Sequence, residues 1–295
     1  MGLCDDVRER CAAIAARARF VRIDLEHLGE VEPGPEPALD PECHYLEGSG
    51  EDVAAYLLAL DTINFGSGWF PTLRKRRVDG TEASGYRTVA WALADRWRAQ
   101  GPWANDELAE LDAAAVADVL GQDSGHELMS LYAGALRDLG GFLGQRSALE
   151  LIESAGRSAE RLAELLASGM AFFHDPPFFK RAQIAPNDLD LAGIGEFDDL
   201  DRVTIFADNL VPHVLRVDGV LHYDRDLGAM IDAGRLLQAG SPEEVEIRAC
   251  AVHAGELVAA RLGVPPRIVD SWLWNRGQAA RYKARPRHRT RTVFY

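Results

Sequence analysis

The chain has 295 residues, of which 47% are hydrophobic, and its formal net charge is −14. This length and composition allow a sizeable core, and we expect a single domain over residues 1–295. Such an acidic surface repels a nucleic-acid backbone, so no stable nucleic-acid partner is expected. No apolar run approaches the ~18 residues of a membrane span, so no membrane association is expected either.

The cysteines and histidines do not form a metal or disulfide framework. Cys4, Cys11, Cys43 and Cys250 are scattered, with no C-x-x-C pair, and this pattern favours a reducing, cytoplasmic location. The eight histidines form no H-x-x-x-H array. Because the sequence also lacks a glycine-rich phosphate loop and a G-x-S-x-G motif, we expect neither a metal nor a cofactor.

Apolar spacing predicts a mainly α-helical fold with short β-hairpins. Helices are expected over 3–19, 50–65, 87–99, 105–120, 124–143, 147–155, 157–173, 242–262 and 268–275. A proline-rich loop over 31–42 leads to His44. The Asp-Gly pairs at 79–80 and 218–219 predict hairpins within 74–86 and 217–223. The apolar end of the chain, near Tyr295, is expected to dock on the body.

One stretch, Thr204–Leu215, changes from a strand-like pattern to a helical one at Asp208. An acid at such a boundary caps a helix by accepting backbone N–H bonds, or it points into a pocket as a fixed negative charge. Lys180 and Arg181 follow a run of aromatic residues, and are either exposed cations or phosphate ligands. The segment from Arg276 to Tyr295 carries seven cations and no acid. It is either a phosphate-binding rim or a basic tail that pairs with the acidic body.

Taken in order, several stretches resemble the queuosine salvage protein family. They are Asp61–Phe65, Ser84–Tyr86, Phe179–Ile184, Phe206–Asp208 with Val211-Pro212, Glu244–Cys250, Asp270–Trp274 and His288–Tyr295. The set covers most of the chain, and its order is more specific than any single motif.

The resemblance implies a single, mostly helical domain similar to helix-rich DNA glycosylases. It also implies cleavage of queuosine 5′-monophosphate to queuine and ribose 5-phosphate. We expect the protein to act without a cofactor and as a monomer. The family's base-contacting positions correspond here to His44, Phe206, Asp208, Asp270, Ser271 and Asn275. The chain departs from the family pattern at the last two positions, where the pattern has Tyr and Asp.

Breaking a glycosidic C–N bond creates an oxocarbenium-like sugar, which an enzyme stabilises with a fixed carboxylate. Queuine is a 7-deazaguanine, so protonation at N7 is not available and a buried anion near C1′ becomes more important. We assign Asp208 to the sugar and water and Asp270 to the base edge, with Phe206 stacking on the base; the reverse assignment of the two acids stays open. The candidate phosphate ligands are Lys180, Arg181, Arg289 and Arg291.

Two other functions remain open at this point. A non-catalytic protein that binds a modified nucleotide would use the same residues without turnover. A nucleic-acid glycosylase is suggested by the fold analogy alone, and the net charge of −14 counts against it because duplex binding needs a broad basic surface.

Overall fold

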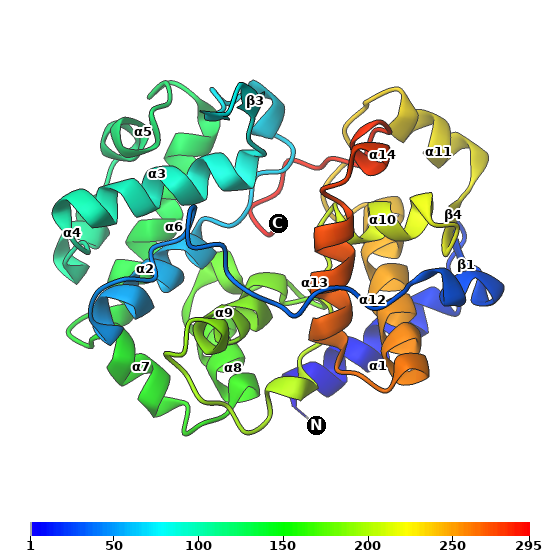
Figure 1. Cartoon of the computed structure of the whole chain (residues 1–295), viewed down its shortest axis with the longest axis horizontal. Coiled ribbons are helices and arrows are strands. Elements are labelled where there is room, and N and C mark those ends of the chain that lie inside the picture. The colour runs from blue at the N-terminus through cyan, green and yellow to red at the C-terminus, as the bar shows by residue number, and fades with distance from the viewer. Residues whose placement is uncertain (1) are drawn as a thin grey trace.

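The computed structural model describes residues 2–295 and confirms the mainly helical fold (Figure 1). The helices are α1 (Leu3–Ala15), α2 (Gly50–Thr62), α3 (Gly85–Gln100), α4 (Asn105–Glu110), α5 (Ala113–Leu120), α6 (Glu127–Leu143), α7 (Ala148–Ser154), α8 (Ala159–Gly169), α9 (Lys180–Leu191), α10 (Val211–Val217), α11 (Arg225–Asp232), α12 (Pro242–Leu262), α13 (Pro266–Arg276) and α14 (Ala280–Lys283). The strands are β1 (Val21–Ile23), β2 (Arg77–Val78), β3 (Thr81–Glu82) and β4 (Leu221–Tyr223).

The helices form two lobes, each around its own apolar core. The first lobe contains α2–α9, with a core that includes Leu93 and Leu136. The second lobe contains α1 and α10–α14, with Val214 and Ile247 in its core. Figure 1 shows the lobes side by side, with the C-terminus between them. Since α1 packs on both α12 and α8, the start of the chain joins the two lobes.

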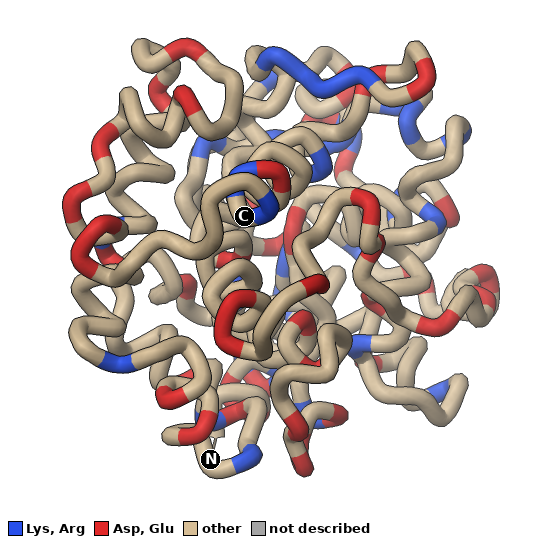
Figure 2. The backbone as a smooth tube through the Cα atoms, turned by 60° about the vertical axis from the view of Figure 1, so that its left-hand side comes forward, with Lys and Arg blue, Asp and Glu red and all other residues tan. Residues whose placement is uncertain are grey.

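Local sequence signals explain where several helices begin and end. Ser49 and Asp52 form a reciprocal capping box at the start of α2. The Ser241 hydroxyl accepts the Glu244 N–H at the start of α12, and Gly263 ends that helix with φ 68°, a conformation that suits glycine. Figure 2 shows acidic residues in many separate places along the backbone.

Three predicted elements differ in the structure. The 217–223 hairpin is wrong: α10 continues to Val217, and Leu221–Tyr223 pairs antiparallel with Val21–Ile23 instead. The helix predicted over 105–120 is two helices, because Asp112 caps α5 by accepting the Ala115 N–H. The helix predicted over 157–173 stops at Gly169, since the next residue is extended. The hairpin within 74–86 is confirmed as β2–β3.

A buried ion pair connects the two lobes. The Arg248 guanidinium on α12 binds the Asp175 carboxylate through two hydrogen bonds of 3.1 and 2.6 Å, and its Nε donates to the Ala207 carbonyl at 2.9 Å. The guanidinium lies between two rings, 3.9 Å from the centroid of Phe178 and 4.5 Å from that of Tyr295. Both charged side chains are almost fully buried, so neither has water as an alternative partner.

We predict that Arg248→Met lowers the free energy of unfolding by about 3–5 kcal/mol, because Asp175 is then left buried without its partner. Urea denaturation at neutral pH measures the loss. Arg157→Met is the control, since Arg157 binds Asp198 through two hydrogen bonds with 56% of its own side chain exposed, and surface pairs contribute little. Equal midpoints for the two variants would contradict the role given to the buried pair.

Candidate active site

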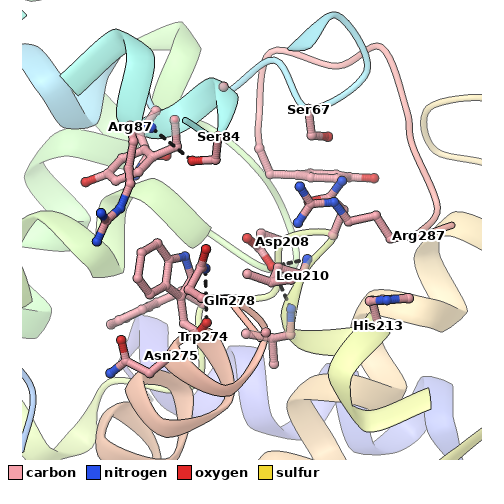
Figure 3. Close-up of a pocket in the computed structure, with 18 of the residues that line it drawn as sticks. Ser67, Ser84, Arg87, Asp208, Leu210, His213, Trp274, Asn275, Gln278 and Arg287 are labelled. Carbon is pink, nitrogen blue, oxygen red and sulfur yellow. Dashed lines mark hydrogen bonds between the residues drawn. The ribbon is translucent and has the colours of Figure 1, made fainter. Parts of the chain in front are cut away.

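A cavity of about 700 Å³ opens between the two lobes. Both lobes supply its walls, and Figure 3 shows part of the lining. The wall segments are the loop around His44, the start of α3, one face of α9, the stretch from Phe206 to His213, α13 and the tail from Lys283 to Arg289. Segments far apart in the sequence therefore meet at one concave site, which is the usual arrangement of a small-molecule binding site.

Asp208 caps α10 and also lines this cavity. Its Oδ1 accepts the N–H groups of Leu210 at 2.7 Å and Val211 at 3.0 Å, and these bonds fix the carboxylate at the cavity wall. Hydrogen bonds from N–H groups to an ionised acceptor are stronger than those between neutral groups. The capping interaction therefore holds a negative charge in one orientation at the middle of the cavity.

Asp270 lies beside Asp208 but in a different environment. It sits on α13, is buried, and its Oδ1 accepts the Phe206 N–H at 2.8 Å. Burial raises the pKa of Asp270 well above its usual value, and the negative charge of Asp208 raises it further. The two carboxyl groups, named here the acid pair, therefore face one cavity from different environments, since Asp208 is held by two backbone N–H groups and Asp270 is buried on α13.

Lys180 is a cation close to the acid pair, since the charges of both Asp208 and Asp270 act on it. Its side chain is buried, and Nζ donates to the Asn64 carbonyl at 3.2 Å. Burial lowers the pKa of Lys180, whereas the charge of Asp208 acts in the opposite direction. The ammonium therefore offsets part of the negative charge that the cavity would otherwise concentrate.

The C-terminal tail forms a cationic end of the cavity with three arginines, Arg285, Arg287 and Arg289. Burial lowers the pKa of Arg287, and the neighbouring Asp208 opposes this shift. In Figure 3, Arg287 lies on one side of Asp208 and Trp274 on the other. The tail is held by backbone contacts, since Leu237 N–H donates to the Arg289 carbonyl at 2.9 Å and Gly66 N–H donates to the Tyr295 carbonyl at 3.0 Å, so the expected docking of Tyr295 is confirmed.

The opposite end of the cavity is aromatic. His44 is held by two contacts, from Nδ1 to the Asp40 carbonyl at 2.8 Å and from Nε2 to the Tyr86 hydroxyl at 2.9 Å. The Tyr86 ring meets Trp274 edge-on, with 6.2 Å between centroids. Burial lowers the pKa of His44, so its ring is held in the neutral form.

Most of the residues that the sequence singled out line the cavity, and two do not. The lining includes His44, Lys180, Phe206, Asp208, Asp270, Ser271, Asn275 and Arg289. Phe206 is buried, whereas Asn275 lies at the exposed rim, 3.5 Å from the Ser271 hydroxyl.

Arg181 and Arg291 lie outside the cavity lining. The Arg181 guanidinium is buried in the first lobe, donates to the carbonyls of Thr62, Phe172 and Val293, and faces the Phe65 ring. It faces away from the side of α9 that carries Lys180, because adjacent helical residues are about 100° apart. Arg291 is exposed and pairs with Glu127 at 3.3 Å. The structure therefore does not support either one as a phosphate ligand.

Sequence reasoning missed several residues that line the cavity, namely Tyr86, Asn187, Asp188, Trp274 and Arg287. One face of α9 lines the cavity with Lys180, Ile184, Asn187, Asp188 and Leu191. Polar residues at helical spacing on a largely buried helix are the signal in the sequence that could have identified this face. No comparable periodicity marks Arg287, because it lies in an irregular tail.

Comparisons with known proteins identify relatives of this chain. The family model described as "Queuosine salvage protein" matches residues 43–295. A protein of Sphaerobacter thermophilus named queuosine 5′-phosphate N-glycosylase/hydrolase is 34% identical over 88% of this chain and 86% of its own length. Proteins with the same name from Mus musculus and Dictyostelium discoideum are each 29% identical over 98% of both chains. The chain therefore belongs to the queuosine salvage protein family.

Proposed function

We propose that this protein hydrolyses the N-glycosidic bond of queuosine 5′-phosphate and releases queuine and ribose 5-phosphate. The relatives carry the name of this activity. The observation in this chain that carries the proposal is the acid pair, in which a helix-capping carboxylate and a buried carboxyl share one cavity. Water adds to C1′, and the base leaves with the bonding electrons and gains one proton.

In this proposal Asp208 stabilises the sugar cation and orients the attacking water. Its position is fixed by the N–H groups of Leu210 and Val211 before substrate binds. A charge that is already oriented needs no reorganisation as the bond breaks, which is the main source of electrostatic catalysis. The adjacent ammonium of Lys180 keeps this concentration of negative charge tolerable in a buried site.

Asp270 is assigned to the base. It holds the backbone of Phe206, whose ring lines the cavity and offers a stacking surface for the base. The raised pKa of Asp270 favours the protonated form of its carboxyl. A protonated carboxyl donates a hydrogen bond to the base as negative charge builds up on it, and a 7-deaza base needs this help because N7 is absent.

The 5′-phosphate is assigned to the cationic end, with Arg287 and Arg289 as its ligands. Arg287 is close enough to Asp208 for their charges to interact, as a ribose that spans the two residues requires. We further propose that the protein acts as a monomer in the cytoplasm. Four buried cysteines without disulfides support a reducing compartment, and no helix over residues 2–295 has the length and apolarity to span a membrane.

The first test is incubation of the protein with queuosine 5′-phosphate, followed by chromatography for free queuine. Queuosine and guanosine 5′-phosphate are the control substrates. We expect release from the queuosine compounds only, fastest with the phosphate present. Tight binding without release would replace the proposed hydrolase with a non-catalytic binding protein.

Asp208→Asn separates the charge of this residue from its capping role. Asparagine also caps helices well, so we expect the thermal midpoint to change little. The kcat for queuine release should fall at least about 100-fold, because the fixed negative charge is gone. Asp112→Asn is the matched control, since Asp112 caps α5 in the same way outside the cavity lining. A fully active Asp208→Asn enzyme would refute the assignment.

The pH dependence of kcat tests Asp270. Its pKa is raised, so the active protonated form persists to a higher pH than in an ordinary aspartic acid and is lost as the pH rises through the raised pKa. The rate should therefore fall on the alkaline side. In Asp270→Asn this alkaline decline should disappear, and kcat should be about 10²–10⁴-fold lower because no proton is available to transfer. A variant that keeps the alkaline decline would assign it to another group.

Arg287→Gln tests the phosphate assignment. The ratio of kcat/KM for queuosine 5′-phosphate to that for queuosine should fall about 10- to 100-fold, the effect of losing a charge-assisted hydrogen bond. Arg291→Gln, outside the cavity lining, should leave the ratio unchanged. Equal ratios in the two variants would remove Arg287 from the phosphate site.

A further inference from the structure

The aromatic end of the cavity holds a buried acid that the proposed hydrolysis does not use. The Asp188 side chain lies on α9, lines the cavity, and the residue is 7% exposed. Its Oδ1 accepts a hydrogen bond from the Asn187 amide at 3.1 Å. Within residues 2–295, the structure records no other hydrogen bond and no ion pair to this carboxylate. A buried carboxyl with so few partners in a cavity wall is available to a ligand.

Helix α9 sets the distance between Asp188 and the reaction centre. Lys180, Ile184 and Asp188 recur every four residues on the face that lines the cavity. Eight residues of helix advance about 12 Å at 1.5 Å per residue. Lys180 lies within charge contact of Asp208, so the backbone of Asp188 is about two helical turns farther along the same wall.

Two aromatic residues line the cavity on the side of Asp188. The charge of Asp188 acts on the Tyr86 hydroxyl, which places these two side chains close together. Trp274 meets the Tyr86 ring edge-on. A carboxylate near aromatic rings suits an ammonium group, which gains from the charge and from the faces of the rings.

The cations of this end of the cavity are already paired with other acids. Arg87 binds Asp40 at 2.9 Å, and Arg267 binds Asp201 at 3.1 Å. Lys180 donates to the Asn64 carbonyl and lies near the acid pair. None of these three forms an ion pair with Asp188, so a cationic ligand would not have to displace one.

We propose that Asp188, with Tyr86 and Trp274, forms a subsite for the protonated amine on the 7-substituent of the base. This inference rests on the proposed function. The substituent of queuine is an aminomethyl group that carries a cyclopentenediol, and its secondary amine is positively charged at neutral pH. With the phosphate at the cationic end and the sugar at Asp208, the substituent projects toward Asp188. The subsite would make the enzyme select 7-deazaguanine nucleotides with a cationic substituent.

The test compares two 7-deazaguanosine 5′-phosphates that differ in substituent charge, one with a cationic 7-aminomethyl group and one with a neutral 7-cyano group. The wild-type enzyme should have a kcat/KM at least about 10-fold higher for the aminomethyl nucleotide, as expected when a buried carboxylate binds a cation. In Asp188→Asn this preference should fall about 10-fold or more. Asp190→Asn is the matched control, because Asp190 lies on the same helix outside the cavity lining, and it should keep the preference.

The outcomes separate this inference from the proposed function. If the wild-type enzyme cleaves both nucleotides without preference, or if Asp188→Asn slows both equally, the subsite is wrong while the hydrolase stands. If no nucleotide is cleaved, the proposed hydrolase is wrong. The subsite can then still be tested by calorimetric measurement of binding to the Asp208→Asn protein. The aminomethyl nucleotide must bind to it more tightly than the cyano nucleotide, and this difference must disappear when Asp188 is also replaced.

The pH provides a second readout that a purely structural role would not affect. Burial raises the pKa of Asp188 to about 6, so its carboxylate is lost as the pH falls through that value. The groups whose charges act with Asp188 are Asp61 on α2, Tyr86 on α3, Lys180 on α9 and Asp270 on α13. The preference for the aminomethyl over the cyano nucleotide should therefore decline below about pH 6 in the wild-type enzyme. In Asp188→Asn it should be independent of pH. A preference that is constant from pH 5 to 8 in both proteins would overturn the subsite.

Discussion

The buried contact between Arg248 and Asp175 is the constraint on which the site depends most. One guanidinium binds a carboxylate through two hydrogen bonds, holds the Ala207 carbonyl and faces the Tyr295 ring. Ala207 lies between Phe206 and Asp208, so the same cation fixes the backbone that presents both residues. Buried pairs of this kind contribute little net stability relative to apolar packing but are costly to break. Here the pair sets a geometry, because the Phe206–Asp208 stretch and Tyr295, which both line the cavity, meet at the Arg248 guanidinium.

Helix α9 extends this arrangement along the cavity. On its inner side, the Gln183 amide accepts the Thr204 N–H at 2.9 Å and donates to the Phe178 carbonyl at 2.9 Å. These bonds attach the helix to the stretch that leads to Asp208. On the cavity side the same helix carries Lys180 and Asp188. On one face of α9 the polar groups of Gln183 and Arg181 bind mainly backbone, whereas the face that carries Lys180 and Asp188 is left to the cavity.

Sequence patterns predicted the helices well where apolar spacing and caps agreed, as in α12 between Ser241 and Gly263. They failed where a local signal had two meanings. Asp-Gly at 218–219 is a common hairpin turn, but here it follows the end of α10, and Leu221–Tyr223 finds its partner two hundred residues earlier in β1. Pairing between strands this far apart in the sequence depends on the tertiary packing of the second lobe, and the local spacing of residues does not predict it.

The site could be predicted in part, for the same reason. Asp208 and Asp270 stand at helix boundaries or in a matched motif, whereas Asp188 and Arg287 become site residues only through tertiary placement. Adjacent residues also diverge: Lys180 reaches the cavity and Arg181 the core, because one helical step turns the side chain by about 100°. Adjacent cations of the basic tail also differ in position. Arg287 and Arg289 line the cavity, whereas Arg291 pairs with Glu127 at the surface.

The distribution of charge explains how a chain with a net charge of −14 can offer a site to an anion. Most of the acidic residues are not buried, so water and salt screen their charges over about 10 Å. Inside the cavity the screening is weaker, so a few fixed groups dominate. The lining includes arginines of the tail, the acid pair and Asp188. Under the proposed function, a nucleotide that is negative at its phosphate and positive at its base substituent gains from this distribution of charge in the orientation that brings its sugar to Asp208.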